Sequence, residues 1–231
     1  VAPFVYERIL NPLALLLGVP VVFILFIYAA KKILATDEAG LKKYNRIIIL
    51  VYIVFQAIIL SMDTLNFSDG AEIENEAHYM LNYGKFSGER YFLVYPNNIT
   101  PTIILYWIYR IAAFLHISEV WMLHIFCFLV TTATIFLTYK TAGKLLTKQK
   151  QTIILGLMIL YIPFQMYSLF YYSDTLMVIM VALIIYVLIP SDGSFIFRTK
   201  HIVAVAILVA FAWNLRSNII IILPALIVYL L

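Results

Sequence analysis

Charged residues are scarce in this chain: Asp, Glu, Lys and Arg make up 12% of the 231 residues, whereas 64% are hydrophobic. The mean hydropathy is +0.98. The core of a soluble domain of this size could not bury so much apolar side chain, so lipid must be the solvent for most of it. The basic residues gather in short loops without forming a stripe, and the net charge of +4 therefore gives no support for nucleic-acid binding.

Metal-binding and phosphate-binding patterns are also missing. The only cysteine, Cys127, lies inside an apolar run, which excludes an intrachain disulfide and a cysteine-based zinc cluster. No paired metal-ligand spacing and no Gly-rich phosphate loop is found. The sequence therefore predicts neither a zinc site nor a site for a soluble nucleotide sugar, and the cofactor stays unknown, with a divalent cation as an open alternative. The histidines that lack such spacing are His78, His116, His124 and His201.

What the chain does have is a series of long apolar runs. Crossing about 30 Å of hydrocarbon takes roughly 20 helical residues. The runs are apolar throughout rather than alternating, which favours helices over the strands of a barrel. We therefore predict an all-α fold, a polytopic transmembrane helical bundle that forms a single domain over residues 1–231. The predicted spans are 12–30, 46–65, 119–139, 152–170, 175–190 and 202–215.

The two ends of the chain suggest a fragment. Residue 1 is Val rather than Met, and no signal-peptide pattern precedes the first apolar run. A further run begins at Ile219, and the chain stops inside it at Leu231. We therefore expect the sequence to be part of a longer protein.

The distribution of charge in the loops predicts which side each loop faces. Residues 31–46 hold five basic and two acidic residues, so this loop is expected on the cytoplasmic side, where Lys and Arg are retained. Residues 63–95 hold six acidic and two basic residues, so this loop is expected outside. The membrane is then the plasma membrane with its active face outside, or the endoplasmic reticulum membrane in a eukaryote.

The apolar segment 101–115 is the decisive one for this topology. If it crossed the membrane, the lysines between 140 and 150 would lie outside, against the positive-inside rule. The segment is short, opens with Pro101 and contains Arg110, which favours an interfacial or re-entrant helix. Residues 63–118 are therefore predicted to form one large external loop with juxtamembrane amphipathic helices, and residues 171–175 a second external loop. Asp69, Asp174 and Arg216 then share the external face.

Residues 68–72 have the pattern of a helix start. Asp69 stands at the N-cap position with Glu72 three residues later, which is the spacing of a capping box. The helix is expected to run to Asn82, to end at Gly84 and to rest its apolar side on the membrane surface. A cap alone would explain Asp69, so this structural interpretation stays open beside a catalytic one.

Several short motifs, in order, resemble a known family. Asn66-Phe67-Ser68-Asp69 is followed by Tyr95-Pro96, then by Tyr171-Tyr172-Ser173-Asp174 and finally by Leu215-Arg216-Ser217-Asn218. Together these motifs resemble the GT-C superfamily of integral membrane glycosyltransferases, most of all its protein O-mannosyltransferase and aminoarabinose-transferase branch. The resemblance covers roughly residues 46–231. Gly70 and the pair Asn97-Asn98 depart from it, because the family often has an acidic residue and Pro-Pro-Leu at these places.

The resemblance implies an enzyme and its site. Its donor would be a sugar on a polyprenyl phosphate, and its acceptor a glycan, lipid or protein on the extracytoplasmic face. Asp69 would be the catalytic base, Asp174 a second acidic residue of the site, and Arg216 the residue that binds the lipid phosphate. Partial desolvation near lipid favours protonation of a carboxylate and improves it as a base, and a guanidinium can hold two phosphate oxygens.

Each of these residues also has a simpler interpretation. Arg216 could extend from a helix end toward water, and Asp174 could simply cap a helix. If Asp174 has a role in the reaction, it could orient the acceptor or help to bind a divalent ion. Tyr95, Asn97 and Asn98 could bind the sugar, but they also fit ordinary turn chemistry. A transporter or flippase, or a noncatalytic membrane subunit of cell-envelope polysaccharide assembly, remains the alternative function.

Overall fold

The computed structural model describes residues 12–62, 69–190, 199–222 and 224, with side chains from residue 20 onward. All regular structure in these residues is helical, which confirms the all-α prediction. The helices are α2 (Pro12–Leu34), α3 (Glu38–Leu60), α4 (Asp69–Tyr83), α5 (Arg90–Val94), α6 (Ile99–Leu115), α7 (Glu119–Leu145), α8 (Lys148–Leu160), α9 (Ile162–Gln165), α10 (Ser173–Leu188) and α11 (Thr199–Leu215), with 3-10 turns η1 (Pro96–Asn98), η2 (Met166–Ser168) and η3 (Ser217–Ile221).

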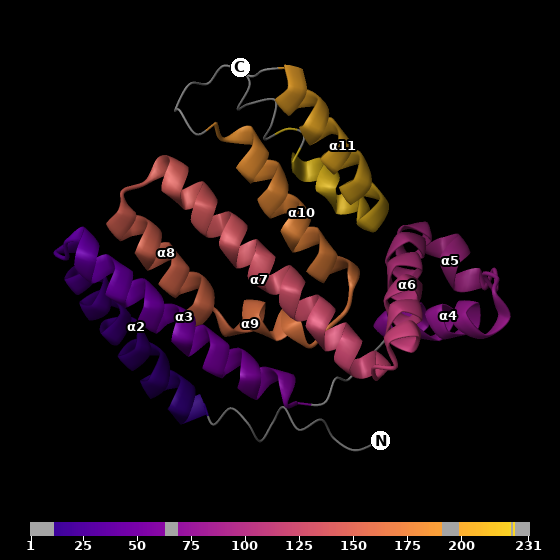
Figure 1. The fold of residues 1–231 in the computed structure, drawn as a ribbon, viewed down its shortest axis with the longest axis horizontal. Helices are drawn as coiled ribbons and strands as arrows, with labels where there is room; N and C mark the ends of the chain where they lie inside the picture. Colours follow the sequence, from indigo (N-terminus) through magenta and orange to yellow (C-terminus); the bar gives the residue numbers. More distant parts are fainter. Residues whose placement is uncertain (1–11, 63–68, 191–198, 223, 225–231) are drawn as a thin grey trace.

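The long helices stand side by side, with α7 near the middle. Helix α7 packs against α8 on one side and α10 on the other, α3 packs on α8, and α11 packs on α10 (Figure 1). One buried apolar cluster joins α3, α7, α8 and α9, and a larger one joins α4, α6, α7, α10 and α11. The second cluster packs the short helices α4 and α6 against the bundle.

Within the described residues, three helical segments are long and apolar enough to cross a membrane, namely α3, α7 and the continuous stretch Pro96–Leu115. A bent pair, Lys148–Leu160 and Ile162–Ser168, makes a fourth if it is counted as one span. The chain is therefore consistent with a membrane protein. The predicted spans 175–190 and 202–215 form shorter apolar helices, α10 and α11, of 16 and 17 residues. The run predicted from Ile219 lies mostly outside the described residues.

The span predicted over 152–170 is wrong as a single straight helix. The chain bends by 69° between Leu160 and Ile162. Pro163 lies just after the bend, and because proline removes a backbone donor and clashes with the preceding turn, a helix usually breaks there. The bend redirects the chain into α9 and η2, which lead to the residues just before α10.

The bend is held to α3 by two buried amides. Gln56 on α3 donates from Nε2 to Oε1 of Gln165 at 2.7 Å, and Gln165 donates from Nε2 to the Met158 carbonyl at 2.6 Å. Both glutamines are buried. The Gln165 side chain thus accepts from one neighbour and donates to a carbonyl at the end of α8, where helical partners run out.

Gln165→Met is expected to destabilise the protein by about 2 kcal/mol, because a side chain of similar length removes both hydrogen bonds and leaves buried polar groups behind. Gln149→Met is the matched control, since Gln149 is only partly buried and donates at 3.5 Å to the Thr36 carbonyl. Thermal unfolding in detergent measures the difference. Equal melting temperatures for the two variants would contradict a structural role for the buried amide pair.

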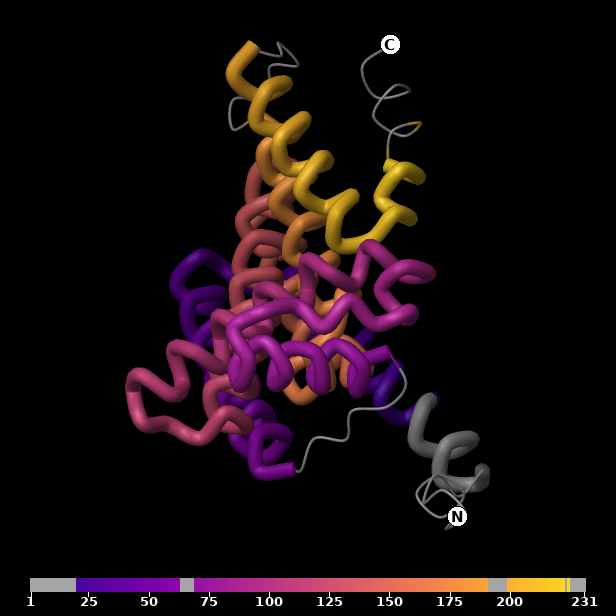
Figure 2. The backbone as a smooth tube through the Cα atoms, turned by 90° about the vertical axis from the view of Figure 1, so that its right-hand side faces the viewer, coloured from indigo at the N-terminus to yellow at the C-terminus, as the bar shows by residue number. Residues whose placement is uncertain are grey.

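The segment Pro96–Leu115 differs from its prediction. The sequence predicted about 15 residues, which is too short to span a membrane. In the structure, η1 and α6 together form 20 residues that are long and apolar enough to cross one. The segment nevertheless lies across one end of the bundle. Figures 1 and 2 show α4 and α6 side by side at the end of the bundle where α7 begins, oblique to α7. Only residues 116–118 separate the end of α6 from α7, and both ends of α6 lie at this end of the bundle.

The sequence predicted that the apolar face of helix α4 rests on lipid, but in the structure this face packs against protein. Ile73 and Ala77 are completely buried, and they pack in the cluster that holds Leu105 and Ile108 of α6. The α6 surface therefore covers the α4 face that was assigned to the membrane. The predicted end of α4 is close to correct, since the helix ends at Tyr83 and Gly84 follows with φ of +67°.

The opposite end of the bundle carries the basic loops. Lys148 pairs with Glu38 at 2.6 Å, which places the start of α8 beside the start of α3. Lys144 of α7 donates to the carbonyls of Tyr186 and Ile189 at the end of α10, at 2.6 and 2.7 Å. A cation at a helix C-terminus is favourable because the last carbonyls lack helical partners. The lysines of 140–150 and the basic loop 31–46 therefore lie at one end, and α4, α5 and α6 at the other.

The orientation of these two ends can be tested by cysteine labelling. Lys85→Cys is expected to react with an impermeant thiol reagent in intact cells, whereas Lys150→Cys reacts only after permeabilisation, since basic loops are retained in the cytoplasm. Both positions are exposed, and the native Cys127 is buried, which keeps the background low. Labelling of Lys150→Cys but not Lys85→Cys in intact cells would reverse the predicted orientation.

Candidate functional site

Asp69, Asp174 and Arg216 come together although they are far apart in the sequence. Asp69 is the first residue of α4, Asp174 the second residue of α10, and Arg216 follows the end of α11. Arg216 forms an ion pair through Nη1 with Oδ1 of Asp174, and it also lies 3.4 Å from the Ser173 hydroxyl oxygen as a donor. The packing of α10 against α11 brings this pair together, because Asp174 lies near the start of α10 and Arg216 directly follows the end of α11.

Tyr172 joins Asp69 to the ion pair. Its hydroxyl donates to Oδ2 of Asp69 at 2.7 Å, and its ring centroid lies 5.8 Å from Cζ of Arg216. A guanidinium at this distance over an aromatic ring is attracted by the ring quadrupole. One side chain therefore touches both the carboxylate of α4 and the cation that follows α11.

A second tyrosine completes the cluster. Burial raises the pKa of Tyr91 on α5, and the neighbouring Asp69 carboxylate raises it further. Asn98 of η1 is 1% exposed and donates from Nδ2 to the Tyr91 hydroxyl at 2.5 Å. Asn98 thus holds the Tyr91 hydroxyl to the turn η1.

The two phenols act as hydrogen-bond donors at neutral pH. Burial raises the pKa of Tyr172, and the hydrogen bond with Asp69 raises it further. A raised pKa keeps a phenol protonated well above neutral pH, since the ordinary value is about 10. The Tyr172 O–H is therefore a donor to Oδ2 of Asp69 at neutral pH and orients that oxygen.

The other predicted sugar-binding residues lie at the edge of this cluster. Tyr95 is 47% exposed and its ring lies 5.1 Å from the Tyr91 ring. Asn97 donates to Oδ1 of Asn98 at 3.0 Å. Residues 96–98 form a 3-10 turn with Pro96 at its start, as the turn interpretation predicted, and this turn contacts α11. Of the three, Tyr95 presents the most surface to a ligand.

The structure corrects both capping interpretations. Asp69 is inside α4 as its first residue rather than before it, and its Oδ2 accepts from Tyr172. Asp174 lies one residue after the start of α10, whose N-cap is Tyr172 without a side-chain cap bond. Arg216 does not simply extend toward water, because its guanidinium pairs with Asp174. All three charged side chains are thus used for contacts between helices.

Sequence reasoning missed Tyr91, Tyr172 and Ser173. Tyr172 stands inside the motif that drew attention to Asp174, but no local pattern distinguishes it, and its extended backbone (φ −156°, ψ 169°) is known only from the structure. In an extended chain, neighbouring side chains point in opposite directions. Tyr171 accordingly donates to the Pro101 carbonyl at 2.7 Å inside the core, while Tyr172 turns to Asp69.

The cluster combines two acidic side chains with one guanidinium. A guanidinium carries five N–H donors, so the contacts through Nη1 leave it able to bind an anion with others. In the described part of the chain, no group of three or more His, Cys, Asp or Glu side chains is placed to hold a metal ion. The chemistry that these residues offer is a carboxylate base beside a fixed cation.

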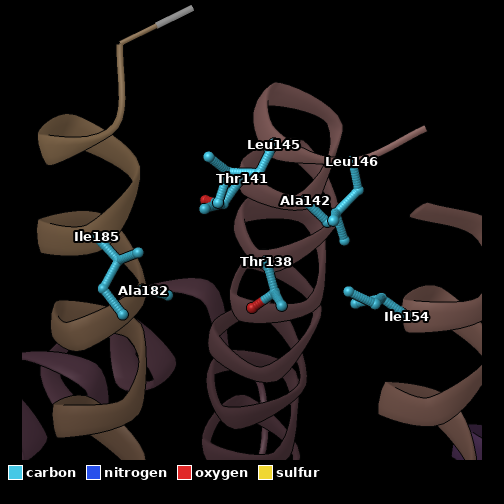
Figure 3. A pocket seen from close by; sticks show the side chains of 8 residues that line it. All are labelled: Thr138, Thr141, Ala142, Leu145, Leu146, Ile154, Ala182 and Ile185. Atoms are coloured by element: carbon cyan, nitrogen blue, oxygen red, sulfur yellow. The ribbon is translucent and has the colours of Figure 1, made fainter. Parts of the chain in front are cut away.

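A separate apolar pocket of about 220 Å³ lies away from this cluster, between α7, α8 and α10. Figure 3 shows Thr138 and Leu145 of α7, Ile154 of α8 and Ile185 of α10 around it. Its position is near the basic end of the bundle, because these residues lie toward the end of α7 and α10 and near the start of α8. The pocket suits hydrocarbon rather than a phosphate or a sugar.

Comparison with known proteins adds no relative: no family model matches this sequence, and no curated protein or solved structure is significantly similar to it. The functional argument therefore rests on the motifs of the sequence and on the arrangement of their residues in space.

Proposed function

We propose that this protein is a membrane glycosyltransferase that moves a sugar from a polyprenyl-phosphate donor to an acceptor on the extracytoplasmic face. The observation that carries the proposal is the network Asp69–Tyr172–Arg216–Asp174. It supplies a base and a phosphate-binding cation in contact with one aromatic residue. The same charged residues are those that the resemblance to the GT-C superfamily singles out.

The reaction assigns one task to each charged side chain. Asp69 accepts the proton of the acceptor hydroxyl as its oxygen forms a bond to the anomeric carbon of the sugar. The bond between that carbon and the phosphate oxygen breaks, and the electron pair leaves with the polyprenyl phosphate. Arg216 stabilises the charge that develops there, because fixed cations stabilise a leaving phosphate best where water is partly excluded. Asp174 holds Arg216 in place.

The location of the cluster suits a lipid-linked donor. It lies among the ends of α10, α11 and the short helices, away from the centre of the long ones. Beside it, α5 exposes Leu93 and Val94 at 79% and 60%. Apolar side chains on a short helix at this level would contact lipid, so a polyprenyl chain can approach while its phosphate reaches Arg216.

A donor-release assay on the full-length protein in nanodiscs tests the proposal. Polyprenyl-phosphate sugars with different sugars are supplied in turn, and free polyprenyl phosphate and transferred sugar are measured. We expect stoichiometric release and transfer with at least one donor. Absence of both over the whole panel, with a folded protein, would reject the enzymatic function.

The bend between α8 and α9 gives a specific reason to test a second function. Broken helices with buried polar residues occur in transporters, and Gln56 and Gln165 lie at this break. A flippase would carry a fluorescent lipid-linked sugar across a vesicle membrane without releasing polyprenyl phosphate. Measuring both activities in one preparation separates the two functions.

A further inference from the structure

We infer that Tyr172 is the positioning residue that holds the base and the phosphate-binding cation in a fixed arrangement. This inference rests on the proposed function. Its hydroxyl donates to Asp69 at 2.7 Å, and its ring lies 5.8 Å from the Arg216 guanidinium carbon. Tyr172 thus contacts two charged residues from two different helical elements. It acts through them and takes no part in bond making.

The backbone around Tyr172 explains why this residue can do so. Tyr171 is 2% exposed and fixed to the Pro101 carbonyl at 2.7 Å. The helix α10 starts at the next residue, Ser173. Tyr172 is therefore anchored on both sides in extended conformation, and its ring has little freedom to leave the space between Asp69 and Arg216.

The two contacts of Tyr172 serve two different steps. The O–H contact fixes which oxygen of Asp69 is free to accept a proton, so it affects the chemical step. The ring contact holds Arg216, so it affects binding of the donor phosphate. Because one contact uses the hydroxyl and the other the ring, substitution can separate them.

Tyr172→Phe keeps the ring and removes the hydroxyl. We expect kcat to fall about tenfold or more, since a small displacement of a catalytic group costs much of its effect, with KM for the donor changed less than twofold. The split between a lower kcat and a nearly unchanged donor KM is expected because only the contact with Asp69 is lost, while the ring stays beside Arg216. Tyr172→Leu removes both contacts and should raise the donor KM about tenfold as well.

Tyr171→Phe is the matched control. It removes a hydrogen bond of the same length one residue away, but the acceptor is the Pro101 carbonyl and not Asp69. We expect a lower melting temperature with kcat and the donor KM unchanged. This control separates loss of a buried hydrogen bond from loss of the contact with Asp69.

The outcomes distinguish this inference from the proposed function. Wild-type protein that transfers no sugar rejects the proposed function and the inference with it. An active wild type with inactive Asp69→Asn, but with Tyr172→Phe equal to wild type in kcat, overturns the inference alone. A Tyr172→Phe protein that loses kcat at a nearly unchanged donor KM, beside a Tyr172→Leu protein that also raises the donor KM, supports it.

Discussion

Asp69→Asn is expected to abolish sugar transfer, with kcat reduced by about 10²–10⁴, the range that general-base catalysis contributes. The substitution keeps the size of the side chain and one oxygen that can accept the Tyr172 hydrogen bond, but an amide cannot take a proton from an acceptor hydroxyl. Because Asp69 is only partly buried and begins α4, the fold should persist.

The measurement for Asp69 is sugar transfer at saturating donor and acceptor, with donor binding recorded in parallel. We expect binding of the donor to change little, since Asp69 does not contact the phosphate in the proposed reaction. Glu89→Gln is the control, because Glu89 is an exposed acidic residue of the same segment. Full transfer by Asp69→Asn would remove the assignment of the base.

Arg216→Ala should have the second-largest effect, a loss of about 10²–10³ in kcat, as expected when a group that stabilises transition-state charge is removed. It also leaves Asp174 without its cation, so the donor phosphate meets an uncompensated carboxylate and the donor KM rises. Arg216→Lys keeps the charge but loses the planar fork, and it should recover only part of the activity.

The control for Arg216 is Arg110→Ala. Arg110 lies on α6, is exposed, and contacts Tyr106 and Trp107 rather than the cluster. Donor-release kinetics of Arg216→Ala, Arg216→Lys and Arg110→Ala distinguish the effect of a cation at position 216 from the effect of basic charge in general. If Arg216→Ala binds and cleaves the donor as wild type does, Arg216 is only a structural partner of Asp174.

Much of the fold could be predicted from local pattern. Runs of apolar residues without alternation predicted helices, and Gly84 marked the end of α4 because glycine readily takes the positive φ found there. Pro163 marked a possible helix break in the run 152–170, and the structure has a bend of 69° there, an angle that hydropathy does not give. The burial of Ile73 and Ala77 under α6 was missed because an apolar helix face has the same pattern against lipid as against protein.

The candidate site was predicted in part. Asp69, Asp174 and Arg216 were placed on one face by counting spans, and the structure brings them into one network. Tyr172 and Tyr91 could not be distinguished from the other 15 tyrosines, because a tyrosine at a membrane boundary is common and its partner is set by distant parts of the chain. Asn98 was selected for sugar binding, yet its amide is used by Tyr91.

The sequence by itself determined that the chain is helical and apolar, where its charges gather, and which charged residues lie near the ends of its helices. Those properties depend on composition and on neighbours a few residues apart. Tertiary structure alone decided that α6 covers α4 and that one tyrosine lies between Asp69 and Arg216. These features depend on contacts between residues far apart in the sequence, such as Glu74 with Tyr109 and Asp69 with Tyr172, and only packing fixes such contacts.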